Sequence, residues 1–433
     1  MSFFRNLAGV LLTTAASAPI GLLTSVLLAR FLSTDDRGFY ALAMSFAALA
    51  TMLFQFGWPT ASIFRLRSAG SEPARVSGAA LVFLGGVFAV VTFVVLLVEA
   101  PLRERFLSGL PEVVLVLAAL TLPMRALANG FGAIARGIDR FVYENGYALG
   151  LQLGNLLAVV IAVVWLGGAL VELMWALTAV YALGVLGLMA LVVRATGLSF
   201  SFGPDELRRS FRFGVKTHAM TLMGRLHERL DLFLLAYLLA DPTQIAFFAI
   251  AKGGIQIIQL LPNSLGKVAY PQLAGLESED AARFACALVR QGLLFMVPAS
   301  LLLFAAAPFL LPFVYGEPYA ASTLPFVLML PGVVALGMDR VLSRYFTGTN
   351  QQRPNVVTRA ISLVVNLVLN LLWIPQFGIA GAAAAALVSY AVDALLLIVV
   401  FLRMTDCSIA DLFLLRRADI DPYLRRLQKL RGR

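Results

Sequence analysis

The sequence predicts an all-α polytopic membrane protein, and three observations carry that prediction. Of the 433 residues, 60% are hydrophobic and only 13% are charged, whereas about 25% charged residues are usual in soluble domains. The apolar residues gather in runs of about 20, the length that an α-helix needs to cross a bilayer. A weak internal repeat indicates that the helices form two pseudo-symmetric bundles of six around a central cavity.

Twelve spans can be placed along the chain. Each is a predominantly apolar run long enough to cross the hydrocarbon core, and short polar segments separate one run from the next. The predicted helices cover about 7–29, 39–64, 77–99, 111–135, 145–166, 170–194, 213–240, 243–270, 284–310, 320–347, 354–375 and 379–403. Several contain a proline, at which a helix can bend because one backbone hydrogen bond is lost.

Membrane topology explains the positions of the residues behind the formal net charge of +10. The charge therefore does not indicate a nucleic-acid partner. If both termini lie in the cytoplasm, the cytoplasmic connections and the tail receive most of the basic residues. These are Arg65, Arg67, Arg75, Arg136, Arg140, Arg194, Arg208, Arg209, Arg212, Arg283, Arg353, Arg416, Arg417, Arg425, Arg426, Lys429, Arg431 and Arg433. The opposite side has Arg30, Arg37, Arg103 and Arg105, offset by Asp35, Asp36 and Glu104. The asymmetry follows the positive-inside rule and predicts an even number of helices with cytoplasmic N and C termini.

The internal repeat is visible where one helix turns into the next. Residues 27–43 read LLARFLSTDDRGFYALA, and residues 234–251 read LLAYLLADPTQIAFFAIA. Both join an LLA to a short acidic turn and an aromatic pair, as in transporters built from two six-helix repeats with the substrate path between them. With the glycine- and proline-containing linker at 195–210, the repeat predicts an N-terminal lobe at 1–199, a C-terminal lobe at 200–403 and a basic cytoplasmic tail at 404–433.

The stretch at 212–240 is the most unusual part of the chain. Within one span it holds Lys216, His218, Arg225, His227, Glu228, Arg229 and Asp231. Ionisable residues inside a membrane normally face protein or water. On a helical wheel the apolar residues share a sector of roughly 80°, and the polar ones lie opposite. The stretch is either a basic amphipathic helix on the membrane surface or a spanning helix that lines a wet cavity. The polar stripes of other spans favour the cavity.

Three other spans carry polar residues on one helical face. The stripes are Arg125, Asn129, Gly132 and Arg136 in the fourth span, Lys252, Gln256, Gln259 and Asn263 in the eighth, and Asn355, Arg359, Ser362, Asn366 and Asn370 in the eleventh. Amides in such positions often join helices by hydrogen bonds, and arginines near a span's end, such as Arg359, can extend to the headgroups. Arg125 and Arg225 differ, because each lies some 18–21 Å inside its span at about 1.5 Å per residue.

We expect Arg125, Arg225, Arg229 and Lys252 to form a cationic site for the diphosphate of an anionic headgroup. Guanidinium groups suit phosphate oxygens, although an ion pair with Asp231 is an alternative role for Lys252. The polar side chains expected to line the surrounding cavity are His218, Gln256, Gln259, Asn263 and Asn129. A proton-coupled step is expected at Asp231, Glu228 or Asp393, because buried acids beside cations can titrate.

Neither a metal nor a cofactor is expected. Cys286 and Cys407 are two isolated thiols, without metal-ligand spacing or a disulfide framework. The connections between the spans are short, which leaves no room for a soluble catalytic domain. An enzyme, such as a polysaccharide polymerase with an acidic site on a large outer loop, is therefore disfavoured.

Four segments resemble a known family. They are residues 27–43, RFGVKTHAMTLMGRLHERLDLFLLAYLL at 212–239, FVYGEPYAAS at 313–322 and TGTNQQRPNVVTRAISLVVNLVLNLLWIPQFGIAGAAAAALVSY at 347–390. They are similar to the polysaccharide transport proteins, the Wzx-type flippases of lipid-linked oligosaccharides, which share a superfamily with the MATE multidrug exporters. The resemblance implies a MATE-like pair of six-helix lobes around a cationic cavity, working by alternating access. It assigns no single ligand residue.

The resemblance also implies a function and a location. Family members move an undecaprenyl diphosphate-linked oligosaccharide from the cytoplasmic to the periplasmic leaflet of the bacterial inner membrane, for O-antigen, capsule or exopolysaccharide biosynthesis. Expected partners are this glycan, membrane lipid, and a polysaccharide polymerase or glycosyltransferases. The alternatives are a MATE-type exporter of small molecules, which would prefer carboxylates for cationic cargo, a membrane-embedded polymerase or ligase, and a scaffold for glycosyltransferases.

Overall fold

The fold is that of a computed structural model, which describes residues 2–67, 71–107, 109–201, 203–259, 273, 276, 278–416 and 419. Throughout these residues the regular structure is helical, with no strand. A chain in lipid must satisfy its backbone hydrogen bonds within each segment, and a helix does so. The all-α class predicted from the apolar runs is confirmed.

Contacts divide the chain into two compact units, residues 1–249 with 314–318 and residues 250–313 with 319–433. The first unit contains α1 (Ser2–Phe31), α2 (Thr34–Phe54), α3 (Trp58–Arg67), α4 (Pro73–Leu97), α5 (Glu99–Phe106), α6 (Glu112–Gly137), α7 (Phe141–Val159), the π-helix η1 (Val160–Trp165), α8 (Leu170–Thr196), α9 (Pro204–Leu239) and the start of α10 (Pro242–Ile258). The predicted division into lobes at 1–199 and 200–403 stays a prediction.

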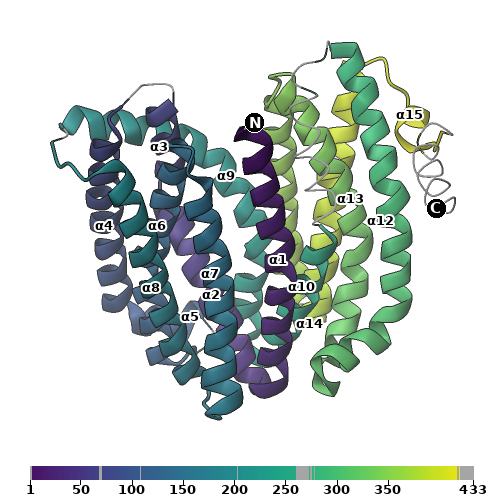
Figure 1. The fold of residues 1–433 in the computed structure, drawn as a ribbon. Coiled ribbons are helices and arrows are strands. Elements are labelled where there is room, and N and C mark those ends of the chain that lie inside the picture. Colours follow the sequence, from purple (N-terminus) through teal and green to yellow (C-terminus); the bar gives the residue numbers. More distant parts are fainter. Residues whose placement is uncertain are drawn as a thin grey trace, which may run out of the picture. The chain divides into compact units, whose positions relative to one another are not determined.

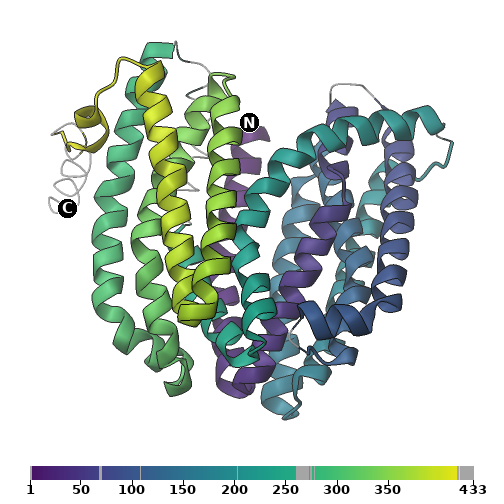
Figure 2. The same ribbon diagram turned by 180° about the vertical axis from the view of Figure 1, so that it is seen from behind.

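The second unit contains the two longest helical segments that the structure describes, α12 and α14. Its elements are the end of α10, most of α12 (Ser278–Tyr315), most of the 3-10 helix η2 (Glu317–Ser322), α13 (Thr323–Gly348), α14 (Arg353–Met404) and α15 (Ile409–Phe413). Gly378 has a non-helical backbone with φ 58°, so α14 is two helices joined at a kink. Figure 2 shows α12, α13 and α14 as long green and yellow helices that run side by side.

Helix α6 lies at the centre of the first unit, in contact with α2, α3, α4 and α8. Small residues make this close packing possible, since they let helix backbones approach. A Cβ added to Gly130, for example, would lie 2.4 Å from the Leu84 side chain of α4. The Thr92 hydroxyl of α4 also donates to the Ala119 carbonyl of α6 at 3.2 Å. Figure 1 shows α4, α6, α7 and α8 running nearly parallel in this unit.

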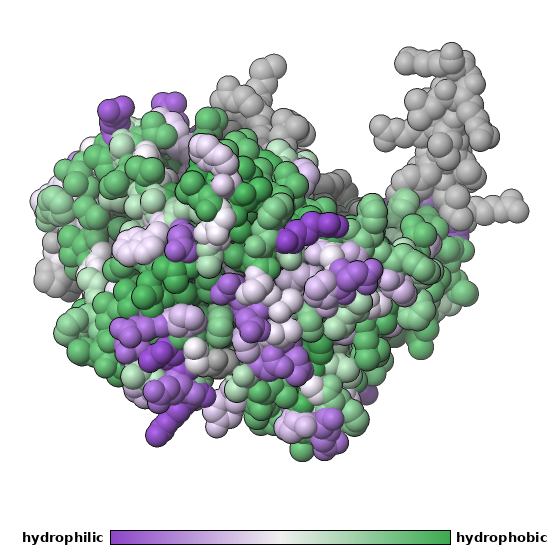
Figure 3. Space-filling model, turned by 90° about the horizontal axis from the view of Figure 1, so that it is seen from below, coloured by the Kyte–Doolittle hydropathy of each residue, from purple (hydrophilic) through white to green (hydrophobic). Residues whose placement is uncertain are grey.

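Eight of the described helices are long and apolar enough to cross a membrane, and one of these is the kinked α14. Their outward side chains are apolar: Val90, Phe93 and Leu97 of α4 are each more than 60% exposed. Such exposure has no cost when the solvent is lipid. Figure 3, a view from below, shows clusters of hydrophilic residues on this face with hydrophobic residues around them.

The two segments of the predicted repeat meet within the first unit. A Cβ added to Gly38 near the start of α2 would lie 1.8 Å from the Pro242 carbonyl oxygen at the start of α10. Beside this contact the Thr243 hydroxyl donates a hydrogen bond to the Asp35 carboxylate. The first turns of α2 and α10 therefore pack backbone against backbone.

The polar stripe of α14 joins the helices of the second unit. The Ser362 hydroxyl donates to the Ser389 carbonyl at 2.7 Å, and the Asn366 amide donates to the Ser389 hydroxyl at 3.3 Å. Arg359 pairs with buried Asp339 at 3.2 Å. The expectation that Arg359 extends to the headgroups is wrong, because a buried carboxylate on α13 holds its guanidinium.

Candidate functional site

The best candidate for a ligand site is a cavity of about 400 Å³ inside the first unit. Five helices contribute to its walls, and we call it the arginine cavity. Its residues are Ala48, Leu49, Thr51 and Met52 of α2, Gln55 directly after α2, Arg125 and Asn129 of α6, Tyr147 and Leu151 of α7, Tyr181 of α8 and Arg229 of α9. Two of the four cations predicted for the diphosphate site, Arg125 and Arg229, thus face one space.

Arg125 lies at mid-span, thirteen residues after the first residue of α6, or about 20 Å at 1.5 Å per residue. Neutral groups hold its guanidinium: Nε donates to the Thr121 hydroxyl at 3.2 Å, and Nη2 lies 3.2 Å from the Met44 sulfur. The Tyr181 ring lies 4.2 Å from the guanidinium carbon, in a cation–π contact. Among the described residues no carboxylate comes within ion-pair distance of Arg125. Its positive charge therefore remains available to an anion.

The other walls supply hydrogen-bond donors. Arg229 of α9 donates from Nη1 to the Ser45 hydroxyl of α2 at 3.1 Å. The Gln55 Nε2 atom is buried and has no acceptor within the described part of the chain. A buried amide without a partner is costly, so this donor is suited to a ligand oxygen. Arginine and amide donors around one space favour an anion such as a phosphate.

A second buried cation, Arg37 of α2, extends the positive region of the first unit. It is 7% exposed, donates to the Ser25 hydroxyl at 3.2 Å and lies 5.3 Å from the Tyr40 ring centre. Tyr40 interacts electrostatically with both Arg37 and Arg125. No described carboxylate pairs with Arg37. The sequence interpretation placed Arg37 in an outer connection and missed its burial.

The remaining residues predicted for the first unit lie in different places. Asn129 lines the arginine cavity. His218 of α9 instead places Nε2 3.2 Å from the Leu53 carbonyl oxygen, near the break between α2 and α3. Asp231 is fully buried in α9. The side chains of Arg225 and Glu228 lie outside the described part of the structure, and their roles stay predictions.

The polar stripe of the eighth predicted span, from Lys252 to Asn263, belongs to the second unit. Lys252 is buried in α10, Gln256 is exposed and Gln259 is half-buried. Asn263 lies outside the described residues. The expected roles of these four residues in binding stay predictions.

Asp393, the third residue predicted for proton coupling, is buried between the helices of the second unit. Its Oδ2 atom lies 3.8 Å from Arg359 Nε, while the same guanidinium contacts Asp339. The Thr358 hydroxyl faces the Asp393 carboxylate, and Oδ1 has no hydrogen bond of normal geometry among the described residues. Two acids thus share one arginine, with Arg340 also interacting electrostatically.

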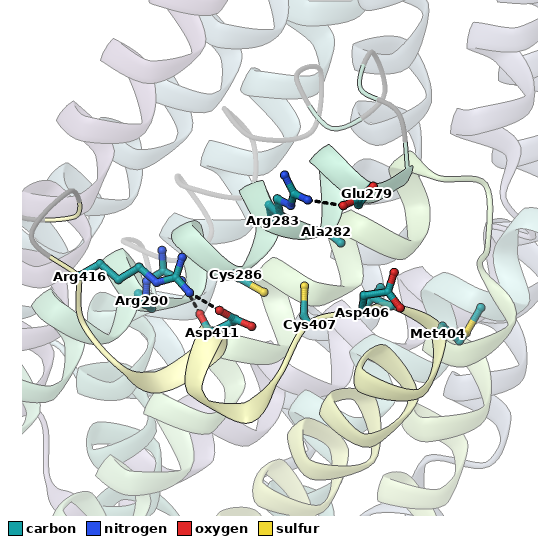
Figure 4. Close-up of a pocket in the computed structure, with 11 residues that line it drawn as sticks. Glu279, Ala282, Arg283, Cys286, Arg290, Met404, Asp406, Cys407, Asp411 and Arg416 are labelled. Atoms are coloured by element: carbon teal, nitrogen blue, oxygen red, sulfur yellow. Dashed lines mark hydrogen bonds and ion pairs between the residues drawn. The ribbon is translucent and has the colours of Figure 1, made fainter.

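A second polar cavity, of about 420 Å³, lies where the chain after α14 folds back on α12 (Figure 4). Each of its arginines has an acidic partner: Arg283 pairs with Glu279, Arg416 with Asp411, and Arg290 with Asp419. Its charges are therefore balanced, unlike that of Arg125. This cavity anchors the tail: Arg290 also donates to the Asp411 carbonyl, and Leu412 of α15 joins the apolar core.

The two cysteines correct one expectation. Cys286 and Cys407 were expected to be isolated thiols, but both line this second cavity, where their side chains lie close to each other (Figure 4). Residues more than a hundred positions apart come together because the chain after α14 returns to the start of α12. Across the described residues, no three His, Cys, Asp or Glu side chains are grouped as metal ligands.

The sequence interpretation missed several residues of the site, among them Gln55, Tyr147 and Tyr181. Tyr181 is only 8% exposed and lies in the middle of α8. Membrane tyrosines concentrate at the two interfaces, so a mid-span tyrosine was a usable signal. The sequence could not show that α7 and α8 bring these rings to Arg125.

Comparison with known proteins adds family and fold. A family described as "Polysaccharide biosynthesis protein" matches residues 3–277. A curated relative from Haloferax volcanii, named "Probable low-salt glycan biosynthesis flippase Agl15", is 21% identical over 195 residues, which cover 44% of this chain and 41% of that protein. The chain thus spans about two fifths of the length of this relative.

Two solved structures share the fold at low sequence identity. One is "Lipid II flippase MurJ, inward closed conformation", with a TM-score of 0.76 and 13% identity over 93% of this chain and 89% of that chain. The other is an inward-facing multidrug resistance MATE family transporter of the MOP superfamily, with a TM-score of 0.72 and 15% identity over 90% and 94%. These likenesses confirm the predicted MATE-like architecture of two six-helix bundles. Since the family match covers more than half of the residues, the chain belongs to the polysaccharide biosynthesis protein family and is a multi-pass membrane protein.

Proposed function

We propose that this protein flips an undecaprenyl diphosphate-linked oligosaccharide from the cytoplasmic to the periplasmic leaflet by alternating access. The observation that supports this most directly is the arginine cavity, in which Arg125 lies at mid-span and its described partners are all neutral. The relative named as a glycan biosynthesis flippase and the fold shared with a lipid II flippase agree with such a cargo. O-antigen, capsule or exopolysaccharide biosynthesis in a bacterial inner membrane is the setting we propose, with both termini in the cytoplasm.

In this proposal the diphosphate binds between Arg125 and Arg229. Guanidinium groups bind phosphate oxygens through directed, charge-assisted hydrogen bonds. The Gln55 amide supplies a further donor, and Arg225 and Lys252 are proposed to join during the transport cycle. Outward movement of an anion from a negative interior gains roughly 2.3 kcal/mol per charge per 100 mV. Two negative charges on the diphosphate would therefore gain roughly 4–5 kcal/mol at that potential.

Asp393 is our proposed site of proton coupling, with Asp231 and Glu228 as further candidates. The shared pairing of Asp339 and Asp393 with Arg359 supports this, because protonation of one acid would leave a neutral ion pair. A polysaccharide polymerase and glycosyltransferases are the proposed protein partners, as suppliers or acceptors of the glycan.

The test is Arg125→Gln in cells that depend on this protein for surface glycan. We expect glycan export to fall at least tenfold at unchanged protein level, because the Arg125 guanidinium lines the cavity and none of its described partners is acidic. Arg105→Gln is the matched control. Arg105 is exposed on α5, so this substitution removes the same charge outside the cavity. Normal export by the Arg125 variant would refute the diphosphate site.

The rival functions predict different results. A MATE-type exporter of cations would place carboxylates on the cavity wall, and the described residues that line the arginine cavity include none. Loss of the protein would then increase drug sensitivity without changing surface glycan. The family and the relatives are named for biosynthesis, flipping and transport, which agrees with a protein that is not an enzyme. Glycan elongation by the purified protein would reverse that conclusion.

A further inference from the structure

Another space adjoins the arginine cavity, with which it shares lining residues. It is a groove of about 620 Å³ between α7 and α8, lined by apolar side chains, glycines and two tyrosines. Among the residues that the structure describes, none that lines this groove is charged, and Leu183 on its wall is 71% exposed. We call it the α7–α8 groove. Its chemistry suits a hydrocarbon chain.

Three glycines keep the groove hollow. A Cβ added to Gly146, Gly150 or Gly187 would meet no atom within 4 Å. Gly154 and Gly184 in the same groove differ, because a Cβ there would lie 2.7 Å from Val180 and 3.1 Å from Tyr147. The close packing of α7 and α8 therefore explains the latter two glycines but not the first three. Since glycine destabilises a helix relative to alanine, the open space at the three positions needs another explanation.

The groove and the arginine cavity share a wall. Tyr147 and Leu151 of α7 line both spaces, and Tyr147 also interacts electrostatically with Arg125 and Tyr181. A cationic space and an apolar space thus lie on the two sides of the same helix turn. A molecule that fills both has an anionic headgroup joined to a hydrocarbon chain.

We propose that the α7–α8 groove holds the headgroup-proximal part of the isoprenoid chain while the diphosphate occupies the arginine cavity. This inference rests on the proposed function and adds the route that the lipid takes. The rest of a long chain remains in the bilayer, which the exposed outer wall of the groove permits. The apolar tail then never crosses a polar space during transport, and only the headgroup and glycan do so.

The first test fills the groove. Gly150→Leu and Gly187→Leu add a side chain where a Cβ would meet no atom within 4 Å, and Gly86→Leu on α4 does the same outside the groove. Binding of undecaprenyl diphosphate is measured with each purified variant in nanodiscs, with inorganic diphosphate as the chain-free probe. We expect the two groove variants to bind the lipid at least tenfold more weakly. The groove variants should bind inorganic diphosphate as tightly as the wild-type protein does. The Gly86 variant should bind both probes with wild-type affinity.

The second test uses photo-cross-linking and does not rely on filling the groove. A photoreactive benzophenone side chain replaces Leu183, which lines the groove, or Leu186, which is 61% exposed on the same helix and does not line it. We expect undecaprenyl diphosphate to be cross-linked from position 183 at least fivefold more than from position 186. Equal labelling at the two positions would overturn the inference.

The other outcomes separate the two proposals. If the groove variants bind the lipid as wild type does while Arg125→Gln does not, the groove inference fails and the proposed function survives. The inference is wrong if the groove variants lose affinity for undecaprenyl diphosphate and for inorganic diphosphate to the same extent. It is also wrong if phosphatidylglycerol competes with undecaprenyl diphosphate at equal affinity, because the groove is then not specific for the isoprenoid chain. If wild-type protein binds neither probe, the proposed function itself fails.

Discussion

Replacing Gly38 by alanine should destabilise the contact between the two repeat segments. The new Cβ would lie 1.8 Å from the Pro242 carbonyl oxygen, 2.5 Å from its carbon and 3.0 Å from its Cα. All three atoms belong to the backbone, so no flexible side chain can move aside. To restore an ordinary contact of 3.4 Å, the two helix starts must separate by 3.4 minus 1.8, or 1.6 Å. The adjacent hydrogen bond between Thr243 and Asp35 would be strained as well.

Two opposing effects set the magnitude. Overpacking costs about 1–3 kcal/mol where the surroundings can shift, and a rigid backbone obstacle favours the upper end. Alanine in a helix regains about 1 kcal/mol relative to glycine. We therefore expect a net loss of about 2 kcal/mol, which should lower the melting temperature of the purified protein by several degrees.

Gly85→Ala is the matched control for this experiment. Gly85 lies inside α4, and a Cβ there would meet no atom within 4 Å. The same chemical change should leave the melting temperature unchanged or raise it. If Gly38→Ala melted at or above the temperature of Gly85→Ala in the same detergent, the backbone contact between α2 and α10 would be refuted.

Two further predictions concern the second unit. Hydrogen bonds from Arg290 hold the pKa of Asp419 below its ordinary value. A carboxyl whose pKa is lower in the folded state stabilises docking above its unfolded pKa near 4 and loses that effect as the pH falls through the folded pKa. The amide hydrogen exchange rate of α15, corrected for intrinsic rates, should therefore rise in acid. The Asp419→Asn variant should exchange fast at every pH. An exchange rate of the wild-type protein that did not change with pH would contradict this prediction. Arg359→Gln should cost about 3–5 kcal/mol of stability, because Asp339 and Asp393 would stay buried without the guanidinium that contacts both. Thermal unfolding measures this loss of stability. The double variant Arg359→Gln with Asp339→Asn should recover part of the lost stability. If Arg359→Gln alone were as stable as the wild-type protein, the pairing would be dispensable.

The site shows the limit of sequence reasoning in its individual residues. Arg125 was identifiable because its distance from both ends of an apolar run prevents it from reaching the headgroups. Arg229 followed from its place on the polar face of α9. The neutral partners of Arg125, by contrast, come from α2 and α8 as well as α6. No spacing within one helix can predict which neighbours it will meet.

By itself, the sequence determined that the chain is a helical membrane protein, because lipid requires each span to be apolar and to satisfy its own backbone. It also determined that ionised groups lie at mid-span, since helix length sets their depth. Only the tertiary structure decided what those groups contact. Arg359 is paired with acids while Arg125 is held by neutral groups, and Cys286 meets Cys407. The physical reason is that contacts between helices depend on packing across long sequence separations, whereas span length and hydrophobicity are local.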